Sequence, residues 1–414
     1  MATILIIGSV WPEPESTAAG QRILQIIEQL KTQNHTTVFA CAAVVSPFSF
    51  DLKSINVETV AIELNNCSFD KFVISLQPHI TIFDRFMIEE QFGWRVHEHV
   101  PDCIRILDTE DLHFVRATRM LNLKKQNKTT AVDYLHSDIA KREIASIYRC
   151  DLSLIISDIE MQILTSIFKI DASILLYLPF LLNEINLCHF EQFPAFADRC
   201  HFITIGNFRH EPNWNSVLYL KDTIWPLIRR ELPDTEMHIY GSYVTQKAMQ
   251  LNNANDGFLV KGRADNVQNV VGNARILLAP IRFGAGIKGK LTDAMCCGTP
   301  SVTTTVGAES MSGQLDWSGI VANDPQDFAN AAVTLYNNEI FWKTAQQNGI
   351  MIINERFNKS FFGKSFLDRI EKLQINIENH RVNNFIGQML NTQILKSNKY
   401  MSKWIEEKNK KISI

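Results

Sequence analysis

The sequence predicts an α/β protein built from two doubly wound, Rossmann-like domains and a helical C-terminal extension. Short apolar, β-rich runs alternate with amphipathic segments, which is typical of parallel strands covered by helices on both faces. The alternation stops near residue 182 and starts again at residue 201, so it predicts two separate sheets. The length of 414 residues agrees with two or three domains.

The apolar runs of the first series predict strands, and a helix is predicted over 21–30. The strands are expected over 3–7, 38–45, 80–83, 104–107, 152–156 and 174–178. The second series predicts a helix over 214–230 and strands over 201–208, 237–242, 257–262, 274–281 and 300–307. Beyond residue 327 the period becomes helical, over 328–337, 340–355 and 361–378.

These patterns divide the chain into residues 1–185, residues 200–355 and a C-terminal part of helices and tail over 356–414, with the seam between Leu182 and Cys200. Tyr400, Met401, Trp404 and Ile405 lie among the lysines of the tail. The six lysines after Ile394 are Lys396, Lys399, Lys403, Lys408, Lys410 and Lys411. A solvated, partly helical tail fits this pattern, and so does a docking surface for a partner, a membrane face or an anionic acceptor.

Composition excludes several classes of protein. The formal charge of −3 argues against a dedicated nucleic-acid binder. No apolar run reaches the roughly 18 to 20 residues that span a bilayer. The opening MATILIIGSVW lacks the basic start of a secretory signal and predicts a first strand. The eight cysteines form no CxxC pair, so we expect reduced thiols, no zinc site and a cytoplasmic protein.

The stretch RFGAGIKGK, residues 282–290, joins three glycines and three cations between an apolar strand and a helical segment. Ligands of an open parallel sheet bind outside the carboxyl ends of its strands. Glycines let backbone N–H groups approach oxyanions, and a helix start adds partial positive charge. Arg282, Lys288 and Lys290 can then neutralise a diphosphate. A glycine-rich connection with incidental surface lysines remains the alternative, and the GxxxxGK[ST] spacing of a Walker A loop is absent.

The segments 205–241 and 261–309, together with the two-domain pattern, resemble the donor-binding domain of retaining GT-B glycosyltransferases, in particular the "glycosyl transferases group 1" set, glycosyltransferase family 4. The resemblance implies two Rossmann-like domains across a cleft and a hexosyltransferase-like enzyme. It also implies a nucleotide-diphosphate sugar as co-substrate, UDP- or GDP-linked, with no bound metal or cofactor. Polysaccharide or glycoconjugate biosynthesis is the implied setting, with a glycan or lipid-linked saccharide as acceptor.

On the donor side, the resemblance gives Asp293 the place of the second glutamate of the family's acid pair, which holds the ribose hydroxyls. The first acid would fall at 283–285, where no carboxylate stands, so backbone amides of the loop are expected to take over part of its role. Arg209 is expected near the diphosphate. The remaining implied donor contacts are Gly284, Gly286 and Ile287 in the loop, and Tyr240, Gly241, Gly262 and Arg263 at the strand ends near the nucleotide.

On the acceptor side, residues 9–22 form a loop before a helix, and the resemblance makes Gly20 and Arg22 candidates there, although a plain connecting loop fits equally well. The segment 107–119 reads D-T-x-D-x-H-x-x-R directly after a strand. It resembles the family segment whose histidine touches the donor sugar. We therefore predict His113 as a catalytic residue, with Asp111 beside it to orient the imidazole or accept a proton.

The predicted chemistry is sugar transfer with retention of the anomeric configuration. No DxD motif is present, so arginine, lysine and loop amides are expected to stabilise the leaving diphosphate in place of a metal. Two alternatives remain: a nucleotide-sugar epimerase of the GT-B type, and a non-catalytic nucleotide-sugar binder, which the missing first acid favours. The predicted location is the cytoplasm, with contact to the inner face of a membrane through the basic tail left open.

Overall fold

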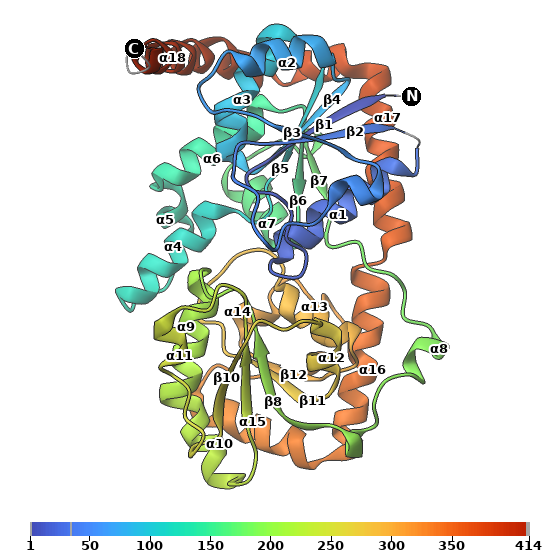
Figure 1. Cartoon of the computed structure of the whole chain (residues 1–414), viewed down its shortest axis with the longest axis vertical. Helices are drawn as coiled ribbons and strands as arrows, with labels where there is room; N and C mark the ends of the chain where they lie inside the picture. The colour runs from blue at the N-terminus through green and yellow to red at the C-terminus, as the bar shows by residue number, and fades with distance from the viewer. Residues whose placement is uncertain (1, 34, 411–414) are drawn as a thin grey trace.

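Two parallel sheets stand end to end in the computed structural model, which describes residues 2–33 and 35–410, without the side chains of residues 393–396 (Figure 1). The N-terminal sheet has the order β3-β2-β1-β4-β5-β6-β7, and the C-terminal sheet has the order β10-β9-β8-β11-β12-β13. Both contain the 3-2-1-4-5-6 order of doubly wound folds. The predicted class, two Rossmann-like domains with a helical extension, is confirmed.

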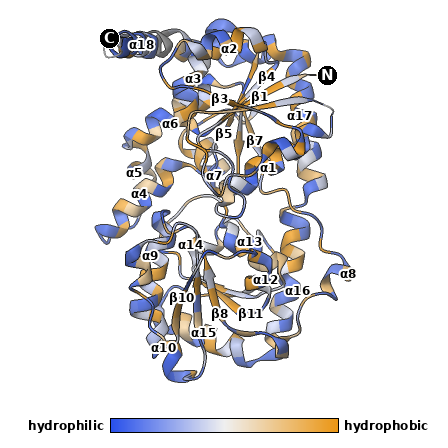
Figure 2. Cartoon of the chain, in the orientation of Figure 1, coloured by the Kyte–Doolittle hydropathy of each residue, from blue (hydrophilic) through white to orange (hydrophobic). Residues whose placement is uncertain are grey.

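The strands of the first sheet are β1 (Thr3–Gly8), β2 (Thr36–Cys41), β3 (Glu58–Ala61), β4 (Ile80–Asp84), β5 (Ile104–Asp108), β6 (Leu152–Ile155) and β7 (Leu175–Tyr177). Those of the second are β8 (Cys200–Ile205), β9 (Met237–Tyr240), β10 (Phe258–Gly262), β11 (Ala274–Ala279), β12 (Ser301–Thr303) and β13 (Gly319–Val321). Every residue of β4, β5 and β6 is buried, as expected of central parallel strands covered on both faces. Figure 2 shows these strands in the colour of apolar residues.

The helices cover both faces of each sheet. Those before the second sheet are α1 (Ala18–Lys31), α2 (Ser68–Leu76), α3 (Phe86–His99), α4 (His113–Lys124), α5 (Ala131–Leu135), α6 (Asp138–Arg149), α7 (Asp158–Gln162) and α8 (Leu187–Phe190). Those that follow β8 are α9 (Glu211–Tyr219), α10 (Trp225–Glu231), α11 (Gln246–Met249), α12 (Val267–Gly272), α13 (Gly289–Cys296), α14 (Thr305–Ala308), α15 (Pro325–Asn337), α16 (Glu339–Arg356), α17 (Lys359–Asn383) and α18 (Phe385–Lys410). Single turns are η1 (Leu52–Ile55), η2 (Ile163–Ile167), η3 (Ala172–Ile174), η4 (Phe196–Asp198) and η5 (Leu220–Ile224).

The last helices carry the chain back to the N-terminal domain. Helix α16 packs on α13 of the second domain, whereas Phe366 and Ile370 of α17 are buried in the same core as Ile4 and Ile6 of β1. Helix α18 then packs on α3 and α6. The two crossings between domains lie side by side, because Leu182 accepts a backbone hydrogen bond from Lys359 and its own N–H donates to Phe357.

Several element predictions need correction. The strand predicted over 300–307 ends at Thr303, since the Thr304 side chain accepts from the Gly307 N–H and begins α14. The strand predicted over 38–45 ends at Cys41. Strands β3 and β13 were not predicted, because both are short and only partly buried. The helix predicted over 214–230 is α9, η5 and α10 in succession, starting at Glu211.

Candidate active site

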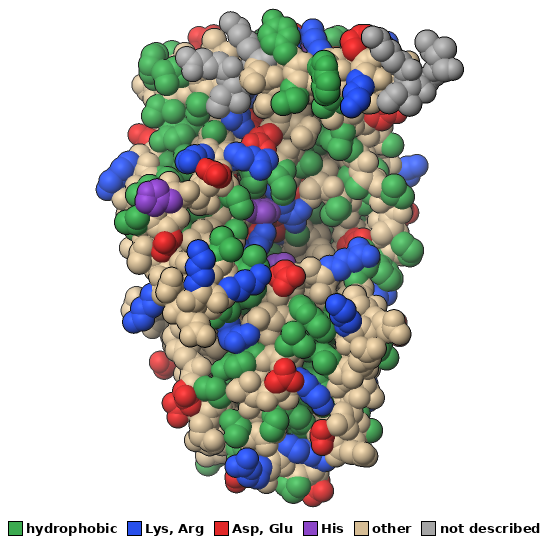
Figure 3. Space-filling model, turned by 90° about the vertical axis from the view of Figure 1, so that its left-hand side faces the viewer, with side chains coloured by type: hydrophobic (Ala, Val, Ile, Leu, Met, Phe, Trp, Pro, Cys, Tyr) green, Lys and Arg blue, Asp and Glu red, His purple; other side chains and the backbone are tan. Residues whose placement is uncertain are grey.

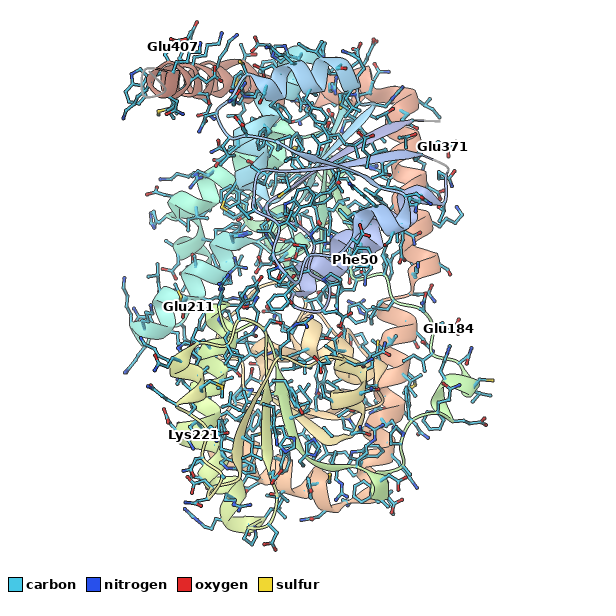
Figure 4. All side chains as sticks on the ribbon, viewed as in Figure 1. Phe50, Glu184, Glu211, Lys221, Glu371 and Glu407 are labelled. Carbon is cyan, nitrogen blue, oxygen red and sulfur yellow. The ribbon has the colours of Figure 1, made fainter. Side chains whose placement is uncertain are left out.

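The carboxyl ends of the two sheets face each other across a cavity of about 620 Å³. The loops after β1, β4 and β5 form its N-terminal wall, and those after β8, β9, β10 and β11 form its C-terminal wall. Figure 4 shows Phe50 in the N-terminal domain and Glu211, at the start of α9, in the C-terminal domain, on either side of the level at which the two domains meet. Figure 3 shows a hollow at this level with histidine, lysine and arginine side chains around it. Ligands of doubly wound folds bind at this edge.

The loop between β11 and α13 supplies the cations of the C-terminal wall. Lys288 precedes the first residue of α13 and is buried, and its ammonium donates to the Gly286 carbonyl at 2.8 Å. Burial lowers the pKa of Lys288 below its usual value. Lys290 is half-buried in the first helical turn, and burial lowers its pKa to about 8, against the smaller effect of Asp293. Two desolvated ammonium groups beside a helix N-terminus form a pocket that favours an anion.

Gly286 has a left-handed backbone with φ of 60°. A Cβ at this position would lie 2.9 Å from the Cβ of Asp111 in the opposite domain, so only glycine lets the two walls approach this closely. The Gly286 N–H donates to Glu160 at 3.0 Å, and the same carboxylate oxygen accepts from the Leu112 N–H at 2.8 Å. Burial and the nearby Asp111 raise the pKa of Glu160 to about 7. Glu160 thus ties the glycine loop to the N-terminal wall.

Asp293 lies one turn into α13 and lines the same cavity, next to Glu15 and Gln21 from the first domain. Burial and the Glu15 carboxylate raise the pKa of Asp293 to about 7, while a hydrogen bond with Gln21 and the Lys290 charge oppose the shift. A carboxyl group with this position and pKa can accept hydrogen bonds from ligand hydroxyls when it is ionised.

The loop between β5 and α4 forms the facing wall. His113 begins α4, and its Nδ1 lies 3.1 Å from the Asp111 carbonyl oxygen and 3.5 Å from a Glu143 carboxylate oxygen. Glu143 also accepts from the backbone N–H groups of His113 and Phe114. Burial alone would raise the pKa of Asp111, but its ion pair with Arg116 holds that pKa well below the usual range. The loop therefore presents an oriented imidazole beside an ionised carboxylate.

Arg85 and Glu110 are two left-handed residues that are not glycine, with φ of 74° and 62°, and both line the cavity. Such a backbone costs roughly 1–3 kcal/mol per residue and concentrates at functional sites. Burial and the carboxylates of Asp108 and Asp84 raise the pKa of Glu110 to about 8, against the effect of the Arg85 charge. Near neutral pH the cavity therefore holds an uncharged acid opposite its lysines.

On the C-terminal side, Arg209 lies 3.9 Å over the ring of Tyr243, whose hydroxyl donates to the Glu13 carboxylate at 2.7 Å. His210 begins the next helix and also lines the cavity. These contacts join the loops after β8 and β9 to the loop after β1.

The cavity brings together ten of the predicted site residues. These are His113, Asp111, Arg209, Gly241, Gly284, Gly286, Ile287, Lys288, Lys290 and Asp293.

The other six predicted residues do not line it. Arg282 is exposed, donates to Asn215 at 2.9 Å and lies over the ring of Tyr219. Arg22 is buried in an ion pair of 2.9 Å with Asp108 and donates to the Leu178 carbonyl.

Gly20 packs against the backbone of Glu13. Gly262 accepts from the Gly241 N–H, and Arg263 lies over the ring of Phe48. The remaining residue, Tyr240, is half-buried at the end of β9.

Sequence reasoning did not single out Glu15, Gln21 and His210 as site residues, although all three line the cavity. None of them carries a local signal, since a polar residue in a loop or at a helix start is ordinary. Their positions depend on the other domain or on a neighbouring loop.

A second, more open cavity of about 420 Å³ adjoins the first and shares His113, Arg116 and Arg209 with it. Its walls are mainly apolar, with Arg142 at the side. The apolar lining residues are Phe86, Met87, Ala117, Met120, Ile139, Pro212 and Phe283. The two cavities together form one continuous groove between the domains.

Solved structures with the same arrangement identify the class of fold. A sucrose-phosphate synthase from Thermosynechococcus elongatus is 14% identical with a TM-score of 0.68, over 90% of this chain and 99% of that one. Anabaena HepE, solved with UDP and glucose, is 10% identical with a TM-score of 0.65, over 90% and 100%. A glycosyltransferase from Rickettsia africae is 12% identical with a TM-score of 0.63, over 90% and 98%. The chain has the GT-B fold.

A family model matches the C-terminal domain. Residues 199–338 match the family described as Glycosyl transferases group 1. An uncharacterized 44.6 kDa protein of the cps region of Klebsiella pneumoniae is 25% identical over 175 residues. That match spans 40% of this chain and 45% of the relative, less than half of its length.

Proposed function

We propose that the protein is a retaining glycosyltransferase that moves a sugar from a nucleotide-diphosphate sugar to an acceptor hydroxyl without a bound metal. One observation carries the proposal. Lys288, Lys290 and the N-terminus of α13 form one wall of a cavity whose other wall presents His113 and Asp111. The first wall suits a diphosphate and the second suits a sugar. HepE was solved with UDP and glucose, which supports UDP as the first nucleotide to test, followed by GDP.

In the proposed step, the bond between the anomeric carbon and the diphosphate oxygen breaks. The acceptor oxygen then bonds the anomeric carbon from the same face, and its proton passes to the departing phosphate oxygen. The leaving diphosphate gains negative charge, which the two lysines and the helix N-terminus stabilise in a water-poor cleft. His113 would contact the donor sugar, and Asp293 would accept from the ribose hydroxyls.

The acceptor would enter through the second cavity, because this cavity opens onto His113 from the N-terminal side. Met87, which is 39% exposed, offers apolar surface to a sugar, and Arg142 adds a charged group. A glycan or a lipid-linked saccharide fits these walls, which supports a role in polysaccharide or glycoconjugate synthesis.

A thermal-shift panel of UDP-, GDP-, ADP- and TDP-sugars tests the donor, since a ligand at about 100 times its Kd stabilises by about 2.7 kcal/mol. The active donor is then incubated with saccharide acceptors, and NMR reads the anomeric configuration of the product. We expect transfer with retention that continues in EDTA. The double variant Lys288→Ala/Lys290→Ala should lose at least about 100- to 1,000-fold in kcat, the usual effect of removing one such donor. Lys247→Ala, exposed on α11 outside the cavity, serves as the control.

Each other outcome has a distinct meaning. Full activity in the double variant would refute the site. An inverted product would refute retention, and activity that EDTA abolishes and a divalent cation restores would refute metal independence. An epimer formed from donor alone would establish the epimerase alternative. Donor binding without transfer to any acceptor would establish a nucleotide-sugar binder.

A further inference from the structure

Helix α18 packs on the N-terminal domain through its polar side. Among the side chains of α18 that the structure describes, Asn391 and Ser402 are the buried polar ones, and they hydrogen-bond to Arg105 at 3.0 Å and to Asn65 at 3.1 Å. Glu406 forms an ion pair of 2.6 Å with Arg95, a fully buried arginine of α3. A surface helix ordinarily turns its apolar stripe inward and its polar residues outward.

The outward side of α18 carries large apolar residues instead. Six of them have between 44 and 68% of their surface exposed: Phe385, Ile386, Met389, Tyr400, Met401 and Trp404. On a helix with 100° per residue, Ile386, Met389, Tyr400 and Trp404 lie opposite Asn391 and Ser402, and Phe385 and Met401 lie on the flanks. The amphipathicity of α18 is therefore largely reversed, with large apolar residues facing solvent, although Leu390 and Ile405 are half-buried. Contiguous exposed apolar surface of this kind marks an interaction site. We therefore expect a binding partner to cover the exposed apolar residues of α18.

The charge of α18 indicates which kind of partner binds it. Its five lysines and two glutamates give a formal charge of +3, whereas the whole chain carries −3. Lys403, Lys408 and Lys410 are exposed, and the ammonium of Lys408 lies 5.3 Å from the ring centre of Trp404. Lys411 lies outside the described residues. A second copy of the chain on the same face would bring +3 against +3, which disfavours a symmetric pair.

We propose that α18 is a membrane-docking helix that lies in the surface of an anionic lipid bilayer. Tryptophan and tyrosine prefer the boundary between lipid and water, and lysines beside them attract anionic headgroups. Within the described ranges no helix is long and apolar enough to cross a membrane, and the mixed composition of α18 is typical of helices that lie in the interface.

The docking surface lies at the end of the molecule remote from the cleft. Glu407 on α18 and Glu211 beside the cleft are far apart in Figure 4, with the N-terminal domain between them. Docking therefore leaves the cavity open to solvent. It is also independent of the proposed sugar transfer.

Vesicle flotation of the full chain tests the proposal. We expect binding to phosphatidylcholine vesicles that contain about 30 mol% phosphatidylglycerol, weak binding to pure phosphatidylcholine, and release at about 0.5 M NaCl, where screening shortens the reach of the lysines. Tyr400→Ser/Trp404→Ser should lower the partition coefficient at least about tenfold through lost interfacial aromatic residues. Lys403→Glu/Lys408→Glu should act similarly through lost charge.

Two controls keep the result specific. Ile340→Ser removes an apolar residue that is 82% exposed on α16, and Lys247→Glu changes a charge on α11. Both should bind vesicles like the parent, and the melting temperature of every variant shows that it folds. The proposal is overturned if the parent ignores anionic vesicles or if the α18 variants bind them equally well. Light scattering that shows a dimer dependent on Trp404 would overturn it in favour of self-association.

Discussion

Lys290 places an ammonium in a half-buried position beside Asp293, and the loss of hydration lowers its pKa to about 8. A lysine poised in this way is charged when an anion arrives at neutral pH and loses its charge in mildly alkaline solution. The same burial that weakens its proton affinity strengthens its attraction for a diphosphate, because fewer waters screen the contact.

The affinity for UDP should therefore depend on pH. Lys290 loses its proton near pH 8, so binding should weaken above pH 8 by up to about tenfold per pH unit as one proton is lost. Between pH 6.5 and 7.5 the ionisation of Asp293, whose pKa is about 7, adds its own change. Isothermal titration calorimetry of UDP across this range measures the effect.

Lys290→Arg is the matched variant, since a guanidinium stays protonated throughout the range. Its affinity should lack the loss that deprotonation of Lys290 causes in the parent above pH 8, whereas Lys247→Arg on α11 should follow the parent. A parent profile that stays flat above pH 8 would contradict the role given to Lys290.

At the scale of residues, the sequence predicted the lysines and Asp293 because they share one loop and one helical turn at a strand end. It did not predict that Arg282 lies outside the cavity, because this side chain turns to Asn215 and Tyr219, two residues more than about 60 positions away. It failed for Arg22 because the phase of α1 points that side chain inward to Asp108. A side chain's direction depends on partners that local spacing does not reveal.

At the scale of elements, the loop between β11 and α13 owes its shape to Gly286. Gly286→Ala would force a left-handed alanine, at roughly 1–2 kcal/mol, and would press its Cβ against Asp111. We expect the melting temperature to fall by about 2–8 °C and sugar transfer to fall with it, as the two walls separate. Differential scanning fluorimetry and a transfer assay measure both effects.

Gly272→Ala gives the contrast within the same domain. Gly272 ends α12, and a Cβ there meets nothing within 4 Å, so the change should be neutral or slightly stabilising. Equal melting temperatures for the two variants would show that the approach of Gly286 to Asp111 is not needed.

The left-handed backbone conformations of Arg85 and Glu110 could not be predicted from the sequence. Glycine signals a left-handed turn, but arginine and glutamate do not, and these two conformations are imposed by the surrounding contacts. The reversed amphipathicity of α18 was hidden for a similar reason. The spacing of its apolar residues predicts a helix but does not tell which side faces the protein.

At the scale of the whole molecule, ion pairs hold the two walls of the cleft together. Arg119 of α4 forms a two-pronged pair with Glu309, at 2.6 and 2.9 Å, and also donates to the Gly284 carbonyl at 2.9 Å. Burial alone would lower the pKa of Arg119, but Glu309 outweighs it and raises that pKa. The pair spans the two domains.

Glu309→Gln should loosen this closure, because the amide cannot balance the Arg119 charge. We expect the KM for the donor to rise about tenfold or more, which corresponds to about 1.4 kcal/mol. The radius of gyration from small-angle X-ray scattering should increase in the free protein. Asp368→Asn removes an exposed ion pair within α17 and should change neither quantity. An unchanged radius and KM in Glu309→Gln would show that the pair does not hold the domains.

The two series of strands predicted the two-domain plan correctly, because continuous apolar runs have few other interpretations. They did not predict that α17 returns to the first sheet. Its apolar residues Phe362, Phe366, Ile370 and Leu373 would suit the face of either domain, and only the position of the crossing at 357–359 decides between them.

The paired crossings at Leu182 and at 357–359 have a mechanical consequence. Both passages of the chain lie together and are bonded to each other. This edge can therefore act as a hinge about which the two domains rotate. Opening of the Arg119–Glu309 pair would then widen the cleft without separating the two crossings.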